Sequence, residues 1–321
     1  MATATQSVPG RARTLLRNVR AGDQVAYLIT FLFAASVVLV TAILVFELWI
    51  KSGAAIHKFG FAFLRTSTWD PVNDEFGALP FVYGTIITSV LGLLMSVPLG
   101  VGAAIFLSEL APPKMSNTLT FLVELLAAVP SVIFGLLAIF ALVPLMRQYV
   151  QPALISSFGW SPFFKGPAYG VGVLTASMVL AIMMFPYIIS ISREALMQVP
   201  PEQREAALAL GATRWEATWD AVVPFARLGI VGSIFLSLAR ALGETMAVTM
   251  VIGNDPKINS SILAPGYTIA SVIANEFTEA TGDIHLAALV ELGLVLFLIT
   301  IILNGLGQLL LVLTAKPGTA R

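Results

Sequence analysis

Cysteine is absent from this chain of 321 residues, and histidine occurs only at positions 57 and 285. The missing thiols exclude disulfides and thiolate metal sites. His57 and His285 lie far apart in segments that we predict to be external loops, with no metal-binding spacing. The phosphate-binding motif G-x-x-x-x-G-K-[ST] is also missing, so the chain should not hydrolyse a nucleotide by that route. No cofactor is expected in this chain, and any energy source should sit on a partner.

Charge is scarce as well. Charged residues make up 11% of the chain and hydrophobic residues 57%, whereas soluble domains carry about 25% charged residues. Several apolar runs exceed the roughly 20 residues that a membrane-spanning helix needs. We therefore predict an all-α polytopic membrane protein with spans near 25–50, 80–108, 118–147, 168–192, 226–252 and 284–314. The expected domains are a tail at 1–24, a transmembrane domain at 25–314 that contains a cytoplasmic loop at 193–225, and a tail at 315–321.

The distribution of basic residues predicts the orientation, because cytoplasmic loops near span ends carry an excess of lysine and arginine. With a cytoplasmic N-terminus, eleven basic residues lie inside and six outside. The inner set is Arg11, Arg13, Arg17, Arg20, Lys114, Arg193, Arg204, Arg214, Arg227, Lys316 and Arg321, and the outer set is Lys51, Lys58, Arg65, Arg147, Lys165 and Lys257. Both termini are therefore expected to be cytoplasmic.

The most polar internal stretch is EQREAALALGATRWEATWDAVVP at 202–224. Pro200 and Pro201 favour the first turn of a helix, and Gly211 favours its end. Thr213 and Glu216 have capping-box spacing, which predicts a second short helix that Pro224 closes before the next span. Two short helices are also found in DNA-binding proteins, but acidic residues outnumber basic ones here, so no nucleic acid partner is expected. An inert connecting loop remains an alternative.

Arg240 and Glu244 lie four positions apart within an apolar stretch. In a continuous helix both would project from one face and reach each other. Charges within a span are costly and mark substrate pathways by default, although such a pair can also merely tie helices together. Thr85 and Thr88 are further pathway candidates, with bonding to their own backbone as the alternative. Glu124 and Glu291 are possible second partners of Arg240, without an assigned role.

Two further features concern local structure. Pro98 and Pro130 lie inside predicted spans, where each removes a backbone hydrogen bond and favours a bend. The external segment 51–79 is rich in aromatic residues, for which we expect an interface belt beside the membrane. These aromatic residues are Phe59, Phe61, Phe63, Trp69 and Phe76.

Several strings carry a resemblance to a known family. Glu205, Ala206, Ala207, Gly211 and Pro224 match the pattern E-A-A-x3-G-x9-I-x-L-P, with Ala221 and Val223 in place of its isoleucine and leucine. This pattern resembles the EAA loop of permeases in ATP-binding-cassette (ABC) importers. The strings WDPVNDEFGALPFVYGTIITS (69–89), ELLAAVPSVIFGL (124–136) and LARALGETMAVTMVIGN (238–254) are similar to the phosphate importer permeases within that class.

The resemblance implies a type I importer permease whose loop docks onto a cytoplasmic ATPase. It implies a complex with a second permease (PstA), an ATPase dimer (PstB) that binds ATP and Mg, and a phosphate-binding protein (PstS), in a bacterial plasma membrane. The segments 51–79 and 253–283 would form the platform for the binding protein. A permease for sulfate, molybdate or an amino acid shares the EAA loop and remains an alternative, and a membrane anchor without transport activity is a more distant one.

Overall fold

A computed structural model describes the fold of residues 10–314, and the side chains of residues 24–313. The chain divides after Lys51 into two compact units. The first unit contains one helix, α1 (Gly10–Lys51), whose described side chains are almost all exposed. The predicted boundary at 24/25 falls inside this helix, and the basic residues at 11–20 precede the described side chains. An apolar helix without a core of its own suits a lipid environment.

The second unit is mostly helical and contains one short hairpin. Its elements are α2 (Gly53–Phe59), η1 (Gly60–Leu64), β1 (Trp69–Asp70), β2 (Glu75–Phe76), α3 (Leu79–Ile105), η2 (Phe106–Leu110), α4 (Pro113–Ala127), α5 (Ser131–Leu137), η3 (Ala138–Leu142), α6 (Val143–Leu145), η4 (Met146–Val150), α7 (Gln151–Phe158), η5 (Pro162–Phe164), α8 (Val173–Met197), α9 (Pro201–Ala209), α10 (Arg214–Ala217), η6 (Thr218–Val222), α11 (Val223–Leu242), α12 (Met246–Thr249), α13 (Ile269–Glu276) and α14 (Asp283–Thr314). The strands β1 and β2 pair antiparallel, with Trp69 opposite Phe76.

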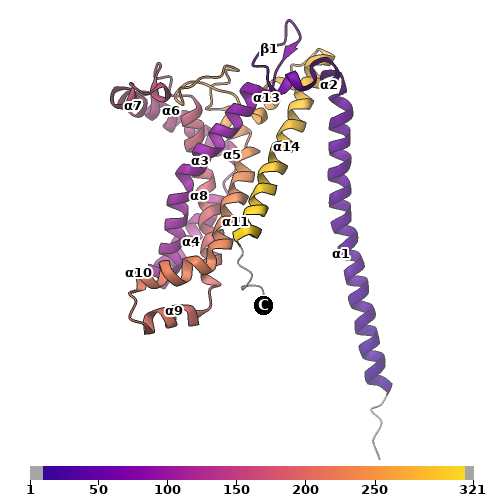
Figure 1. Cartoon of the computed structure of the whole chain (residues 1–321), viewed down its shortest axis with the longest axis vertical. Helices are drawn as coiled ribbons and strands as arrows, with labels where there is room; N and C mark the ends of the chain where they lie inside the picture. Colours follow the sequence, from indigo (N-terminus) through magenta and orange to yellow (C-terminus); the bar gives the residue numbers. More distant parts are fainter. Residues whose placement is uncertain (1–9, 315–321) are drawn as a thin grey trace, which may run out of the picture. The chain divides into compact units, whose positions relative to one another are not determined.

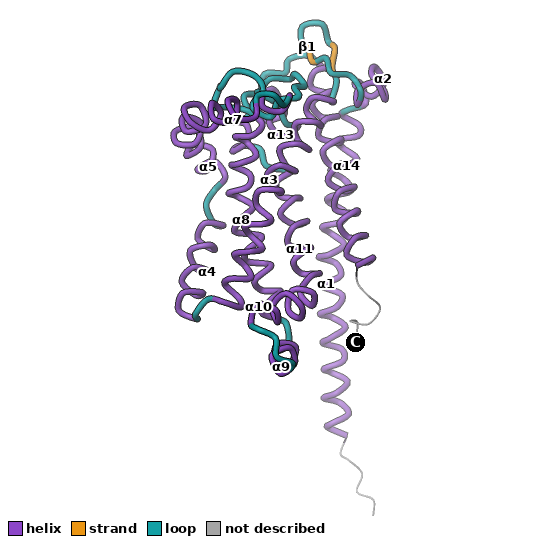
Figure 2. Tube along the Cα trace, turned by 60° about the vertical axis from the view of Figure 1, so that its left-hand side comes forward, coloured by secondary structure: helices purple, strands orange, loops and turns teal. Residues whose placement is uncertain are grey.

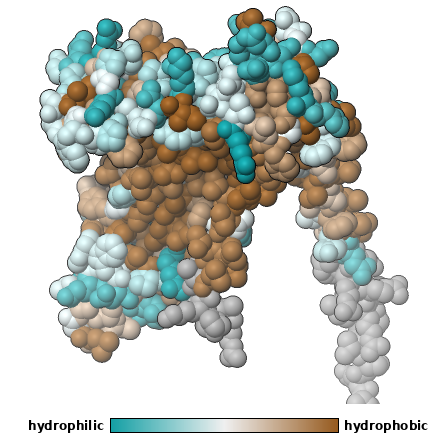
Figure 3. Space-filling view, turned by 45° about the horizontal axis from the view of Figure 1, so that its top comes forward, coloured by the Kyte–Doolittle hydropathy of each residue, from teal (hydrophilic) through white to brown (hydrophobic). Residues whose placement is uncertain are grey.

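The helices α3, α8, α11 and α14 run side by side and form the body of this unit (Figures 1 and 2). The helices α9 and α10 lie at one end, which we call the α9 end. The hairpin, α2 and α13 lie at the opposite end, the hairpin end. A hydrophobic belt separates the more hydrophilic ends of the unit in the space-filling view (Figure 3). This belt is the surface expected of a protein embedded in a bilayer.

Within residues 10–314, six helical runs are long and apolar enough to cross a membrane. They are Gln24–Lys51, Leu79–Leu110, Ser131–Phe158, Val173–Met197, Arg214–Leu242 and Asp283–Leu313. The predicted number of spans is therefore confirmed, and four of the six agree closely with the sequence-based ranges. The third and the fifth differ, and each difference has a local cause.

The third predicted span, 118–147, is not one helix. Helix α4 ends at Ala127 and α5 begins at Ser131, with Pro130 in an extended conformation between them. Proline has no backbone N–H and disfavours a helical conformation in the residue before it, so the helix stops there. In Figure 2, α4 lies toward the α9 end and α5 continues toward the hairpin end, joined by a loop.

The fifth span begins and ends earlier than predicted. Pro224 does not close a separate segment, because the helical run from Arg214 to Leu242 is continuous through it. The five-residue π-turn η6 ends two positions before Pro224, and the amide of Val223 donates to the carbonyl of Thr218 there. Such a widened turn accommodates a proline that cannot donate its own hydrogen bond. The run then ends at Leu242 instead of 252.

The hairpin end has an aromatic core, which contradicts the predicted interface belt for two of its residues. Phe63 and Phe76 are fully buried, and the Trp69 ring packs edge-on against Phe76 with centroids 4.8 Å apart. His285 belongs to α14 and not to a loop, and its ring stacks on Phe76 at 5.1 Å. The Glu276 carboxylate joins these elements, because its Oε2 accepts from Trp69 Nε1 at 2.9 Å and lies 3.1 Å from His285 Nε2.

Candidate substrate pathway and coupling insert

Two helices of the second unit are interrupted, and the interruptions lie close to each other. The first separates α4 from α5 at 128–130, and the second separates α11 from α12 at 243–245. The segments beyond the breaks are in contact, because a Cβ on Gly135 of α5 would lie 2.6 Å from the Met250 sulfur and 3.1 Å from Ala247 Cα. Discontinuous helices in membrane proteins provide polar backbone groups where they line a cavity or a binding site.

Tyr187 of α8 links the two breaks. Its hydroxyl donates to the carbonyl of Ala127, the last residue of α4, at 3.3 Å. Its ring lies beneath the guanidinium of Arg240, with 4.5 Å between Arg240 Cζ and the ring centroid. Tyrosine is suited to this position because it combines a large apolar ring with a polar tip. The sequence analysis missed this residue, and its only signal was a tyrosine in the middle of an apolar span.

Arg240 lies in the last turn of α11 and is exposed on the surface of the chain. The predicted pair with Glu244 on one helix face is wrong, because α11 ends at Leu242 and Glu244 falls in the break. The Glu244 carboxylate instead accepts from the amide of Ala247 at 3.3 Å. Among the described side chains, no hydrogen bond or ion pair occupies the Arg240 guanidinium.

Thr85 and Thr88 of α3 are occupied within the fold. Thr85 Oγ1 donates to the carbonyl of Phe81 at 2.7 Å and accepts from the amide of Ile269 at 3.0 Å. Thr88 Oγ1 donates to the carbonyls of Gly84 and Thr85. Both hydroxyl hydrogens are therefore used by the backbone, and neither is available to an anion in this conformation.

The two acidic candidates for pairing with Arg240 have different environments. Glu124 is exposed on α4, whereas Glu291 is 8% exposed within α14. The Oε2 atom of Glu291 has no hydrogen-bond partner within the described part of the chain. Neither carboxylate forms an ion pair with Arg240 in residues 24–313.

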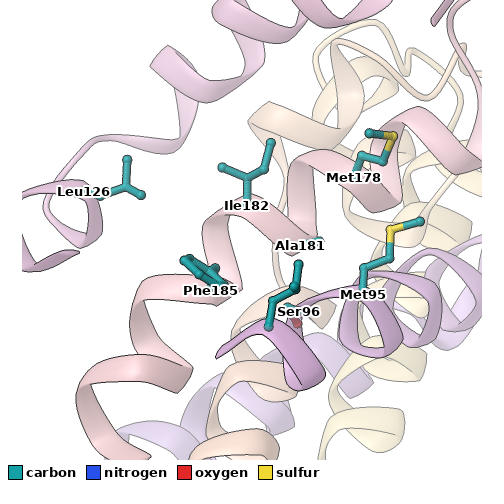
Figure 4. Close-up of a pocket in the computed structure, with 8 residues that line it drawn as sticks. Met95, Ser96, Leu126, Met178, Ala181, Ile182 and Phe185 are labelled. Atoms are coloured by element: carbon teal, nitrogen blue, oxygen red, sulfur yellow. The ribbon is translucent and has the colours of Figure 1, made fainter. Parts of the chain in front are cut away.

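An open cavity of about 420 Å³ lies between α3, α4 and α8 (Figure 4). Its lining is formed by Met95, Ser96, Leu99, Leu126, Met178, Ala181, Ile182 and Phe185. The Ser96 hydroxyl is the one polar side-chain group in this set, and it donates to the carbonyl of Leu93. Such a cavity offers a hydrated anion nothing to replace its water, so it is no anion site.

The predicted two-helix insert is present at the α9 end. Pro200 precedes α9, and Gly211 adopts a positive φ of 92° after the helix, a conformation that favours glycine. The capping box at Thr213 and Glu216 is confirmed, with the Thr213 amide donating to Glu216 Oε2 at 2.7 Å. Helix α9 has no buried residue, and Glu205 and Ala206 are exposed on it, while Ala207 is half-buried. The insert thus presents a low, exposed helix surface.

One side chain of α9 turns back to the helical body. Arg204 forms a two-pronged ion pair with Glu109 of η2, with Nε to Oε2 at 2.9 Å and Nη2 to Oε1 at 2.7 Å. Its remaining donors reach the carbonyls of Val199 and Leu196 at 2.6 and 2.9 Å. The hydrogen bonds to Glu109 hold the pKa of Arg204 above its usual value, against the opposing effect of burial.

Comparison with known proteins assigns the family. Residues 96–311 match the family described as "Binding-protein-dependent transport system inner membrane component". The chain is 47% identical over 277 residues to the phosphate transport system permease protein PstC of Mesorhizobium japonicum, covering 85% of each chain. It is 45% identical over 286 residues to the protein of the same name from Haemophilus influenzae, covering 88% of this chain and 90% of that one.

A solved structure confirms the fold independently of close sequence similarity. An inward-facing structure of the MetNI methionine ABC transporter aligns with 78% of this chain and all of its own matching chain. The TM-score is 0.57 at 16% sequence identity. A likeness at this identity establishes the architecture and leaves the transported solute open.

Proposed function

The chain belongs to the binding-protein-dependent transport system inner membrane components, and within them to the PstC-type phosphate transport permeases, and from this premise we propose how it moves its substrate. It is a multi-pass permease subunit of an ABC transporter and has no catalytic role itself. In our proposal the substrate is inorganic phosphate. The chain forms half of the translocation pathway, and Arg240 contacts phosphate at the two helix breaks.

The observation that carries this proposal is the environment of Arg240. A guanidinium within a span costs about 2.5–3.5 kcal/mol when it faces lipid, and it is normally paired or turned toward water. Arg240 is exposed on this chain and has no acidic partner among residues 24–313. The exposed guanidinium would therefore be best solvated at the interface with a second permease, where a hydrated path would pass.

The chemistry of the group matches the proposed ligand. A guanidinium donates through a planar fork that fits two oxygens of a phosphate. The Tyr187 ring orients this fork from below and leaves its N–H edges unoccupied. Glu244 follows in the same break and carries a negative charge near the path. Its repulsion shortens the residence of the anion, so that phosphate passes through without being trapped.

The proposed partners are the second permease PstA, an ATPase dimer PstB and the phosphate-binding protein PstS. ATP and Mg bind to the ATPase, and its closure moves the exposed helix α9 through contacts at Glu205, Ala206, Ala207 and Gly211. The α9 end then faces the cytoplasm, with both termini on that side of a bacterial plasma membrane. The hairpin end faces outward, where the segments 51–79 and 253–283 would receive the binding protein.

One alternative transport function fits the coupling insert, and a second alternative, without transport, does not account for the structure. A permease for sulfate, molybdate or an amino acid would use the same coupling insert with a different ligand at the breaks. A membrane anchor without transport activity would require neither an unpaired arginine within a span nor an exposed coupling helix.

The decisive experiment measures ATP-dependent uptake of labelled phosphate into vesicles that contain the full complex. We expect uptake that resists excess sulfate and that falls about a hundredfold or more in Arg240→Gln, because two charge-assisted hydrogen bonds contribute about 3 kcal/mol. Arg147→Gln, the same change at an exposed arginine of the hairpin end, is the matched control and should transport normally. An assembled, ATP-hydrolysing complex without phosphate uptake would overturn the substrate, and normal uptake by Arg240→Gln would overturn the site.

A further inference from the structure

The turn η2, at the end of α3, forms polar contacts with two other helices, and one of these is bonded to a third. Arg204 of α9 grips its Glu109 through two hydrogen bonds. The hydroxyl of Ser116 in α4 donates to the carbonyl of Leu107 in the same turn at 2.7 Å. Arg193 of α8 in turn donates to Ser116 Oγ at 3.3 Å. The helices α3, α4, α8 and α9 therefore meet in one polar cluster at the α9 end.

We propose that the Arg204–Glu109 pair is the joint through which α9 moves α3 and α4 when the ATPase acts on the insert. This inference rests on the proposed coupling function and adds the internal step that follows the docking of the ATPase. It assigns to two residues of this chain the transfer of motion from an exposed helix to the helical body.

The way in which α9 is attached supports this role. Helix α9 buries none of its own residues, so apolar packing alone attaches it weakly to the body. The Arg204–Glu109 pair, in contrast, is well enclosed, with the side chain of Glu109 only 9% exposed. Four hydrogen bonds fix the guanidinium in one orientation. A two-pronged ion pair of this kind resists rotation because both of its groups are planar. A movement of α9 therefore displaces the turn η2 in a defined direction.

The position of Glu109 within η2 also supports the proposed joint. The turn η2 is a π-turn, a widened form of helix that is common at functional sites. A displacement of this turn is passed along α3 and, through Ser116, to α4. Helix α4 ends at Ala127, whose carbonyl receives the hydroxyl of Tyr187 beneath Arg240. A continuous set of contacts thus leads from α9 to the proposed phosphate site.

The test uses the full complex in vesicles and measures phosphate uptake and ATP hydrolysis on the same samples. The variants are Glu109→Gln, Arg204→Gln and the double variant, with Lys114→Gln as the matched control, since it removes an exposed positive charge at the same end. Retention of the ATPase during size-exclusion chromatography separates loss of coupling from loss of assembly. Each single variant should keep the ATPase bound and hydrolysing while phosphate transported per ATP falls about tenfold, within the range typical of coupling between sites.

The double variant tests whether the two residues act as one unit. It should transport no less phosphate per ATP than either single variant, because each single change already removes the same contact. The proposed joint would be refuted if the single variants transported as much phosphate per ATP as the wild type. It would also be refuted if the loss in the double variant were the product of two independent losses. A wild-type complex that hydrolyses ATP without moving phosphate would instead refute the proposed function, so the two failures are distinguishable. If the single variants lost the ATPase from the complex, Arg204 and Glu109 would be docking residues and the joint would also be refuted.

Discussion

Arg204 and Arg240 are the same residue type in opposite situations. Arg204 is engaged through four hydrogen bonds, to both oxygens of Glu109 and to two backbone carbonyls. Arg240 rests on an aromatic ring with its N–H groups free of any partner in the described residues. The first arginine lies at the end of the helical body, and the second lies within a span beside two helix breaks.

The contrast separates attachment from binding. A guanidinium with four of its five N–H groups engaged holds elements in place, because removing one partner of a largely enclosed ion pair leaves the other charge uncompensated. A guanidinium held only by its face keeps the edge through which phosphate or carboxylate is recognised. Both arginines stand out in the sequence because charged residues are few. Only the groups that each one contacts in the structure distinguish their roles.

Among three further predictions, the largest effect on uptake is expected when Arg240 keeps its charge and loses its planar shape. Arg240→Lys keeps a positive charge but loses the planar fork, so phosphate uptake should fall about tenfold, the loss of roughly one charge-assisted bond. Uptake in vesicles at several phosphate concentrations measures it. A lysine variant with full activity would show that charge alone acts at this position.

A smaller effect is expected from the aromatic support of Arg240. Tyr187→Leu removes the ring, and uptake should fall about threefold to fivefold, because a cation–π contact contributes about 1 kcal/mol. Tyr187→Phe keeps the ring and loses only the contact with Ala127, one link between α4 and the proposed site, so its loss of uptake should be smaller than that of Tyr187→Leu. Equal losses in both variants would contradict the role of the ring and favour the hydroxyl.

The smallest effect on transport is expected at the two threonines. Thr85→Val leaves the buried amide of Ile269 without its acceptor, which should destabilise the complex by about 1–3 kcal/mol and lower its Tm. Thr88→Val removes bonds only within α3, so its Tm should change less. Uptake by either variant, measured below its Tm, should match the wild type. A selective loss of uptake at unchanged Tm would return these residues to the pathway.

The sequence was sufficient to predict the number of spans, the presence of the insert and the positions of its turns. Each of these depends on local signals: apolar length, Pro201 at a helix start, Gly211 after a helix, and the capping box at Thr213. The ends of the third and fifth spans were missed, because hydropathy continues across Pro130 and Gly243 while the helices do not. The helical spacing of four positions assumes a continuous helix, so it predicted a pair between Arg240 and Glu244 although a helix break separates them.

Contacts between distant segments were beyond the sequence analysis. Tyr187 and Arg240 meet because α8 and α11 pack side by side, and Glu109 meets Arg204 across 95 positions of the chain. The aromatic residues of 59–76 were expected beside the membrane, yet Phe63 and Phe76 are buried against α13 and α14. Composition indicates that such residues prefer an apolar environment, and only the tertiary structure shows whether lipid or protein supplies it.

The exposure of Arg240 also bears on the formation of the complex. A lone chain in the bilayer would hold this guanidinium against hydrocarbon, at a cost of up to about 2.5–3.5 kcal/mol, the value for charged residues at the centre of a span. Association with the second permease would exchange that hydrocarbon for a hydrated seam and recover this free energy. At most, this gain is similar to that from burying a large apolar side chain. In this way the residue that we propose to bind phosphate would also favour the pairing of the subunits before any phosphate arrives.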